Sequence, residues 1–210
     1  RPPEATAARG AGPLRCAGAP PAPAATVEQQ AALDRLLPAL AQFGVHLVHG
    51  VTGSGKTELY MRLIDTMLAA DKQALVLIPE IALTPQLEQH FSRRFPGRHI
   101  AALHSGLGET ARTENWLAAP GCDLLLGTRL SVFAPLPRLG LIVVDEEHDG
   151  SFKQQDGLRY SARDVAIARG KQAGVPVVLG SATPSLESYA QALNGRYRLI
   201  ELKQRAISQA

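Results

Sequence analysis

Short apolar runs alternate with amphipathic segments along most of this chain of 210 residues. The apolar runs span residues 45–48, 74–78, 100–103, 124–126, 141–144 and 175–179. Segments with apolar residues at helical spacing span residues 26–40, 57–70, 85–95, 110–118, 161–173 and 184–193. Buried strands that alternate with helices are typical of a parallel sheet covered on both faces. The pattern predicts the α/β class, with a mainly parallel sheet flanked by helices.

The first 25 residues depart from this pattern. They consist mostly of Ala, Pro, Gly and Arg, and their repeated prolines oppose both helix formation and sheet pairing. We interpret residues 1–25 as a linker and residues 26–210 as one folded domain. Thr26, a residue type that caps helices, opens the domain. Because the chain starts at Arg1 rather than at methionine, we expect a piece of a longer protein.

Composition narrows the class of protein without identifying it. With 45% hydrophobic and 20% charged residues, the chain suits a globular domain, and no apolar run is long enough for a bilayer. Cys16 and Cys122 are far apart and neither lies in a C-x-x-C pair, which disfavours a disulfide framework and a zinc site. We therefore expect a protein of the reducing cytoplasm with no membrane partner. A formal charge of +3 permits a nucleic-acid partner without requiring one.

A glycine-rich stretch, GVTGSGKT at residues 50–57, follows the first apolar run and precedes a helical pattern. This order matches the phosphate-binding loop G-x-x-x-x-G-K-[ST], in which backbone N–H groups and a helix N-terminus bind an anion. Lys56 would contact the outer phosphates of a nucleoside triphosphate, and the Thr57 hydroxyl would hold Mg²⁺. The alternative is a chance match in a glycine-rich loop. The predicted nucleotide-binding residues of the loop are Gly50, Thr52, Gly53, Ser54, Gly55, Lys56 and Thr57.

Adjacent acids follow the apolar run at residues 141–144, in the sequence LIVVDEEHD. Asp145 would lie at the C-terminal end of a strand, where parallel sheets bind ligands, and would hold Mg²⁺. Glu146 would orient or deprotonate an attacking water. This pair favours a hydrolase over a kinase, because a kinase must keep water away from the transferred phosphate. Taken alone, acids at a strand end are more often solvated loop residues.

Five segments occur in the order of motifs I, Ia, Ib, II and III of superfamily-two helicases: GVTGSGKT, PEIALTPQ, GTRLSVFAPL, DEEH and GSATPS. With two further stretches, SFKQQDGLRYSARDVA and LHSGLGETAR, the chain resembles the PriA family of primosomal replication-restart DNA helicases. The resemblance runs from about Thr26 to the C-terminus. It implies a RecA-like P-loop NTPase fold for this part of the chain. The implied protein is the first motor lobe of an ATP-dependent DNA helicase, with ATP and Mg²⁺ as cofactors.

The resemblance also implies a residue that contacts adenine. Gln29 is similar to the glutamine that lies upstream of helicase phosphate loops, although Gln30 competes with it and an exposed glutamine on a helix is commonly only solvated. The family motifs imply that Lys56, Asp145 and Glu146 are the catalytic residues. They also imply that four residues couple hydrolysis to movement of the two lobes. These coupling residues are His148, Ser181, Ala182 and Thr183.

Contacts to DNA are implied at the ends of other strands. Thr84, Thr128 and Arg129 would bind phosphates, which sets affinity and register without reading sequence. A surface ion pair is the alternative for Arg129. Like the other contacts, this one rests on the motif match.

Residues 151–164 combine aromatic and basic side chains, the mixture used for sequence-tolerant binding of single strands. The residues of this mixture are Phe152, Lys153, Arg159, Tyr160 and Arg163. The resemblance implies an aromatic-rich loop that senses DNA here, although Leu158 stands where an aromatic residue is expected. The alternative is that the aromatic residues only anchor the loop to the domain. The predicted DNA-binding residues of this loop are Phe152, Lys153, Arg159 and Tyr160.

Members of the family also carry an N-terminal DNA-binding region, a cysteine-rich zinc module and a second motor lobe with an arginine finger. This sequence shows none of them, so we expect zinc only in the missing part of a full-length protein and weak turnover by this chain alone. The implied partners are single-stranded and forked DNA, primosome proteins and single-strand-binding protein, at stalled forks in the bacterial cytoplasm.

Two other interpretations remain open from the sequence. A small-molecule kinase or another phosphate-loop ATPase would need an acceptor-binding lid, which no stretch offers. A binding module would act as a nucleotide-dependent clamp on DNA or on a partner, without turnover.

Overall fold

The structure, a computed structural model, describes residues 24–206. The predicted linker lies outside the described residues except for its last two positions, so the structure does not test it. Within the described part of the chain, no helix combines the length and apolar character needed to cross a bilayer.

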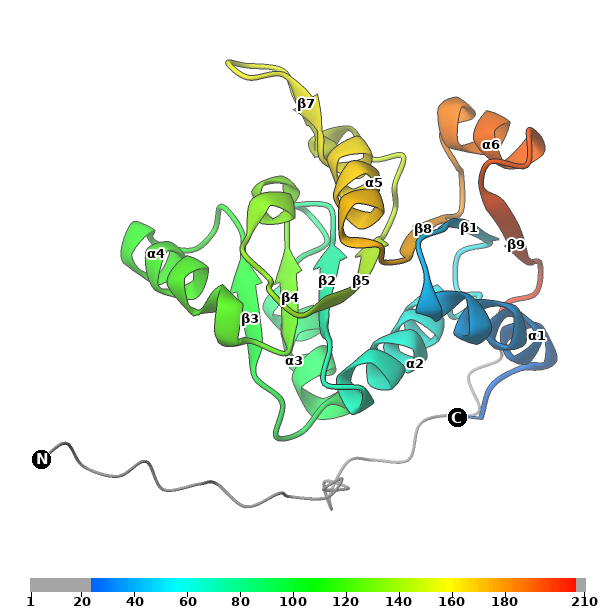
Figure 1. Ribbon diagram of the computed structural model, residues 1–210, viewed down its shortest axis with the longest axis horizontal. Coiled ribbons are helices and arrows are strands. Elements are labelled where there is room, and N and C mark those ends of the chain that lie inside the picture. Colours follow the sequence, from blue (N-terminus) through cyan, green and yellow to red (C-terminus); the bar gives the residue numbers. More distant parts are fainter. Residues whose placement is uncertain (1–23, 207–210) are drawn as a thin grey trace, which may run out of the picture.

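Seven parallel strands form one sheet, in the order β3-β4-β2-β5-β8-β1-β9. The strands are β1 (Val45–Gly50), β2 (Gln73–Leu77), β3 (Ile100–Leu103), β4 (Leu124–Gly127), β5 (Leu139–Val144), β8 (Val177–Ser181) and β9 (Arg198–Leu202). Two short strands, β6 (Lys153–Gln154) and β7 (Tyr160–Ser161), form an antiparallel hairpin of their own. Figure 1 shows this hairpin projecting away from the sheet beside α5 (Ala162–Ala173). The predicted α/β class with a mainly parallel sheet is confirmed.

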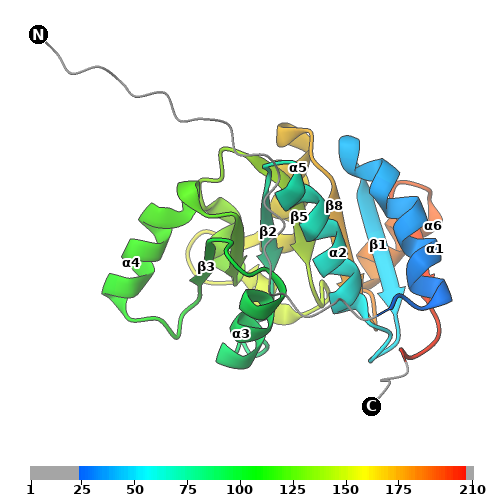
Figure 2. The same ribbon diagram turned by 90° about the horizontal axis from the view of Figure 1, so that it is seen from below.

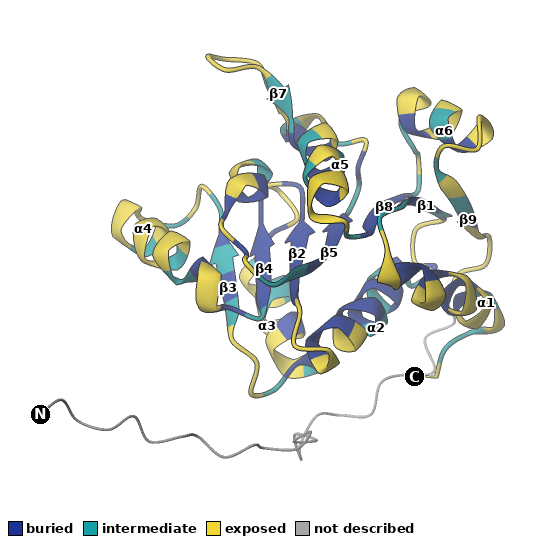
Figure 3. Ribbon diagram, viewed as in Figure 1, coloured by how far each residue is buried: buried dark blue, intermediate teal, exposed yellow. Residues whose placement is uncertain are grey.

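Helices cover both faces of the sheet (Figures 1 and 2). Those besides α5 are α1 (Val27–Leu36), α2 (Lys56–Ala69), α3 (Pro85–Arg94), α4 (Glu109–Ala118) and α6 (Leu186–Leu193). Buried residues of α1, α2 and α3 share one apolar cluster with one side of the strands, and residues of α5 and α6 share a second cluster with the other side. The central strands are therefore buried on both faces (Figure 3), which explains their near-continuous apolar sequences.

Local sequence explains where the first helix begins. Thr26 caps α1 by accepting a hydrogen bond from the Gln29 backbone N–H, and the Gln29 side chain accepts one from the Thr26 backbone N–H. This reciprocal pair is a capping box, which satisfies two donors at the start of a helix. The helix expected after Thr26 is confirmed, and it continues as a 3₁₀ turn over Leu37–Ala41.

The sequence pattern missed β9 and the β6–β7 hairpin. Strand β9 is an edge strand of five residues, and only Ile200 and Leu202 are buried among them. Its run of alternating burial is too short to separate from a loop by pattern alone. Each hairpin strand has two residues, which leaves no period to detect.

One core position of β1 is polar. His46 is 1% exposed, and neither of its ring nitrogens has a hydrogen-bond partner among the described residues. Burial, together with the nearby charge of Arg198, lowers the pKa of His46 from 6.5 to about 4. The ring is therefore neutral in the folded protein at neutral pH.

The buried His46 predicts a loss of stability in mild acid. In the unfolded chain His46 becomes protonated as the pH falls below 6.5, whereas in the folded chain it becomes protonated only near pH 4. The unfolded chain therefore binds more protons between these pH values, so the free energy of unfolding falls as the pH drops through this window. The expected contribution is about 2 kcal/mol by pH 5. Urea unfolding at pH 7 and pH 5 measures it, with His46→Leu as the comparison. An equal acid loss in both proteins would contradict the assignment.

Candidate active site

The glycine-rich loop connects the end of β1 to the start of α2, as the motif requires. Gly53 has a φ of 78° and Gly55 a φ of 83°, a region that glycine adopts without the steric cost of a side chain. Because Gly55 is the N-cap of α2, the positive end of the helix dipole lies at the loop. The backbone therefore forms an anion-binding cradle between strand and helix.

Gln29 lies directly against this loop. Its side chain is buried, and its Nε2 donates a hydrogen bond to the Ser54 carbonyl over 3.1 Å. A Cβ at Gly55 would approach Gln29 Nε2 to 2.0 Å, so only glycine leaves room for this contact. Gln30 is exposed and donates to Asp34 on the same helix. Of the two glutamines that the sequence left open, only Gln29 contacts the loop.

Lys56 joins the loop to the acids after β5. Its side chain is buried, its Nζ donates a hydrogen bond to the Gly50 carbonyl over 3.0 Å, and the same Nζ lies 3.6 Å from Glu146 Oε1. Lys56 and Glu146 are far apart in the sequence, yet this contact brings the two motifs together. The expectation that they form one site is consistent with this contact.

Asp145 follows β5 beside the phosphate loop. Its Oδ1 accepts a hydrogen bond from the buried Tyr60 hydroxyl over 3.1 Å. Burial and the neighbouring Glu146 raise the pKa of Asp145, and burial beside Asp145 raises the pKa of Tyr60. A Cβ at Gly180 would lie 1.5 Å from the Tyr60 hydroxyl, so this glycine makes the contact possible. A cation at Asp145 would favour the charged form of the carboxylate.

Glu146 has an unusual backbone conformation. Its φ is 46°, a left-handed value that few residues other than glycine adopt. Its Oε2 lies 3.6 Å from Nδ1 of His148, and that nitrogen lies 2.8 Å from Ser181 Oγ. His148 Nε2 lies 3.3 Å from Thr183 Oγ1. The side chain of His148 thus connects Glu146 to the segment after β8, where Ala182 lies between Ser181 and Thr183.

Glu147 is a site residue that the sequence analysis missed. It is 2% exposed, and its carboxylate accepts hydrogen bonds from the Ser185 N–H and hydroxyl, the Ser188 hydroxyl and the Arg163 guanidinium. The ion pair with Arg163 has an N–O distance of 3.1 Å. The sequence gives only a weak signal for this role. Glu147 follows two other acidic residues after a strand, and nothing in the sequence distinguishes it from an acid exposed to solvent until its partners on α5 and α6 are known.

These motifs can be compared with known proteins. A family profile described as DEAD/DEAH box helicase matches residues 26–192, which is most of the chain. The chain belongs to the DEAD/DEAH box helicase family. The resemblance to helicases that the motifs indicated is therefore confirmed.

Relatives narrow the helicase family further. The chain is 47% identical over 184 residues to the replication restart protein PriA of Bacillus subtilis, covering 86% of this chain and 23% of the relative. It is 48% identical over 193 residues to PriA of Chlamydia pneumoniae, covering 89% of this chain and 26% of the relative. The predicted resemblance to PriA is confirmed. The chain spans about a quarter of the length of these curated relatives.

Solved helicases share the fold. A structure described as RecG bound to a three-way DNA junction matches with a TM-score of 0.64 and 21% identity, over 88% of this chain and 24% of that one. The DUF1998 helicase MrfA bound to DNA matches with a TM-score of 0.58 and 16% identity, over 85% and 27% of the two chains. At these identities the matches establish the fold alone, and they confirm the predicted RecA-like fold.

The predicted phosphate contacts of this helicase chain follow strands that lie away from the phosphate loop. Thr128 comes directly after β4, is 9% exposed, and its N–H donates to the Leu103 carbonyl. Thr84 caps α3, with its Oγ1 accepting from the Leu87 N–H. Arg129 donates from Nη1 to the Ser151 and Lys153 carbonyls over 3.0 and 3.4 Å. Arg129 is thus held by backbone carbonyls rather than by a surface ion pair.

The hairpin after the acids differs from expectation. Phe152 is 1% exposed within the second apolar cluster, which disfavours its predicted role as a flat face for bases and favours the anchoring alternative. Tyr160 is partly buried and packs edge-to-face on Phe133 at a centroid distance of 5.1 Å. Lys153 and Arg159 are exposed. Leu158, in the hairpin loop, is 79% exposed.

Replacing Glu147 tests the buried ion pair. Glu147→Gln leaves Arg163 without its buried counter-charge and sets an amide N–H against either the guanidinium or the Ser185 N–H, so we expect the free energy of unfolding to fall by about 3 kcal/mol. Glu114→Gln on the exposed face of α4 is the matched control and should change it by less than about 0.5 kcal/mol. Urea unfolding measures both. Equal stability of the two variants would show that the pair contributes nothing.

Proposed function

We propose that the chain is the ATP-binding motor lobe of a bacterial replication-restart DNA helicase. In this role it couples ATP hydrolysis to movement along a single strand and to unwinding at stalled forks. The main support for this proposal is the contact between Lys56 and Glu146, which brings together the phosphate loop and the acids of the DEEH motif. Residues 26–210 would form the lobe and residues 1–25 a linker.

The described residues suit a magnesium nucleotide. No cluster of three or more His, Cys, Asp or Glu side chains within residues 24–206 could hold a metal ion by itself. Magnesium bound with a nucleotide needs no such cluster, because it takes one or two protein ligands and completes its shell with phosphates and water. Asp145 and Thr57 supply those ligands in this proposal. When bound, Mg²⁺ neutralises charge on the phosphates.

The loop offers further support for a bound triphosphate. Ser54 Oγ is buried without a hydrogen-bond partner among the described residues, at a loop where an anion would accept hydrogen bonds. In the proposed complex the backbone of residues 50–55 donates to the phosphates and Lys56 contacts the outer two. Gln29, which is fixed to Ser54, would contact adenine.

Glu146 is the proposed general base. It would accept the proton of the attacking water, and its carboxylate lies 3.6 Å from the Lys56 ammonium at the phosphate loop. His148 would transmit this state to Ser181 and Thr183, which it contacts through its two ring nitrogens. The segment formed by Ser181, Ala182 and Thr183 would then move with the second lobe of a complete helicase.

DNA would bind along the neighbouring strand ends. Thr84, Thr128 and Arg129 are the proposed phosphate contacts, and the exposed Lys153 and Arg159 of the hairpin add positive charge. The DNA-bound state of RecG and of MrfA supports a nucleic-acid partner. Single-stranded and forked DNA, primosome proteins and single-strand-binding protein are the proposed partners, and the bacterial cytoplasm is the proposed location.

Lys56→Ala tests nucleotide binding. Losing the ammonium removes a charged donor to the phosphates, so we expect the affinity for a nonhydrolysable Mg-ATP analogue to fall about a hundredfold. Calorimetric titration measures it, and Lys171→Ala, an exposed lysine in the last turn of α5, is the control. A thermal melt verifies folding. Unchanged affinity in a folded Lys56 variant would remove this residue from the site.

Glu146→Gln tests the proposed base. The amide keeps the shape of the side chain but cannot accept a proton, so ATP binding should persist while phosphate release falls at least about a hundredfold. Phosphate release is measured in the complete helicase, which supplies the second lobe that turnover requires, with excess ATP and single-stranded DNA, beside Glu114→Gln in the same protein. A rate close to that of the unmodified chain would exclude Glu146 as the base.

A further inference from the structure

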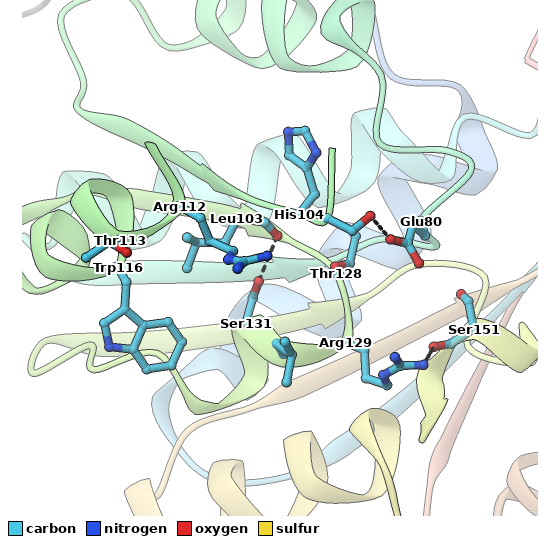
Figure 4. Close-up of a pocket in the computed structure, with 12 residues that line it drawn as sticks. Glu80, Leu103, His104, Arg112, Thr113, Trp116, Thr128, Arg129, Ser131 and Ser151 are labelled. Atoms are coloured by element: carbon cyan, nitrogen blue, oxygen red, sulfur yellow. Dashed lines mark hydrogen bonds between the residues drawn. The ribbon is translucent and has the colours of Figure 1, made fainter. Parts of the chain in front are cut away.

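A second hollow lies on the same edge of the sheet as the phosphate loop. Its volume is about 300 Å³, and it is bounded by the loop after β2, the end of β3, helix α4 and the turn after β4 (Figure 4). None of residues 50–57 lines it. It is therefore separate from the nucleotide cradle.

One wall of the hollow is the side of α4. Arg112, Thr113 and Trp116 line it, and their spacing places them on one face of the helix. Helix α4 has no fully buried residue, and Trp116 remains 36% exposed. Figure 4 shows the indole beside Thr113, bordering the space between α4 and the turn after β4. An indole left half open beside a hollow is a surface that a flat ligand can cover.

The far end of the hollow is polar. The Ser105 hydroxyl donates a hydrogen bond to the Glu80 carboxylate there. Thr128 and Arg129, the proposed phosphate contacts, also line the hollow. Arg129 Nε is buried with no hydrogen-bond partner among the described residues. The hollow is thus lined by a positive charge at Arg129 and by a negative charge at Glu80.

We propose that this hollow is a base-binding subsite, which holds one unstacked base of a single-stranded nucleic acid against Trp116. The inference rests on the proposed function, because the phosphates on either side of that base would pass Thr128 and Arg129. Stacking on an aromatic side chain is tolerant of sequence, since every base has a π face. Arg112 adds a second positive charge at the mouth.

Size and charge favour a base over other ligands. A volume of about 300 Å³ is at the lower limit for small-molecule sites, which suits a single ring system. The exposed Glu80 carboxylate repels a phosphate at its end of the hollow, so the backbone of the strand would stay on the side of Arg112 and Arg129. A peptide helix needs a long open groove to bind. Here Glu80 and Trp116 close the two ends.

The chain carries its own reporter, because Trp116 is its only tryptophan. The experiment titrates the 210-residue chain with an oligothymidylate and, separately, with an abasic strand of equal length, both labelled for anisotropy. The abasic strand keeps the phosphates and lacks the bases. We expect the oligothymidylate to quench Trp116 emission and the abasic strand to bind more weakly without quenching.

Variants sharpen the test. Trp116→Ala should weaken oligothymidylate binding about tenfold and leave abasic-strand binding unchanged, and Trp116→Phe should retain part of the affinity. Leu117→Ala, on the same helix, 73% exposed and outside the hollow, is the matched control and should bind like the unmodified chain. Thermal melts verify that all variants fold.

The outcomes separate the subsite from the proposed function. Oligothymidylate binding that Trp116→Ala leaves intact, or equal changes in emission with both strands, would overturn the subsite alone. Absence of binding to either strand would overturn the proposed DNA contacts and the subsite together. The nucleotide titration of Lys56→Ala is independent of all these outcomes.

Discussion

The buried carboxylate of Glu147 is the constraint on which the rest of the site depends. Donors from the start of α5 and from the turn before α6 converge on it, so it joins the end of β5 to both helices. A buried carboxylate without such donors lowers the free energy of unfolding, so these hydrogen bonds hold Glu147 in place. They thereby restrict the conformations of the residues on either side of it. On one side Glu146 is held at a φ of 46°, and on the other His148 is held beside Ser181.

The parallel sheet determines which chemistry meets at which place. Because all strands of the seven-stranded sheet run in one direction, their C-terminal ends share one edge of that sheet. The ends of β1, β5 and β8 carry the phosphate loop, the acids and the segment that contacts His148. The ends of β2, β3 and β4 carry the hollow and the proposed phosphate contacts. The division falls between the neighbouring strands β2 and β5, so the two halves are adjacent and need no long connection.

Sequence predicted the parts of this arrangement that depend on local pattern. The phosphate loop, the central strands and the helices each carry their own periodicity or motif. Gln29 was only one of two candidates that the resemblance to helicases offered, and its contact with the loop was not predicted. The rest depends on partners distant in sequence. Glu147 acquires its role from α5 and α6, Phe152 is buried by packing that no local pattern reveals, and the hollow needs α4 placed beside β3. Strand β9 is too short and too exposed for its hydrophobic pattern to predict a strand.

The contacts also form a continuous path between the two halves of the edge. Arg129, on the wall of the hollow, donates to the Ser151 and Lys153 carbonyls at the start of the hairpin. The hairpin ends at Ser161, the N-cap of α5, and Arg163 in the first turn of that helix pairs with Glu147. Glu147 is covalently next to Glu146. Phe152 anchors the near end of the hairpin in the core. The packing that buries Phe152 thus fixes the start of the hairpin, which lies along the chain between the Arg129 contacts and the Arg163–Glu147 ion pair.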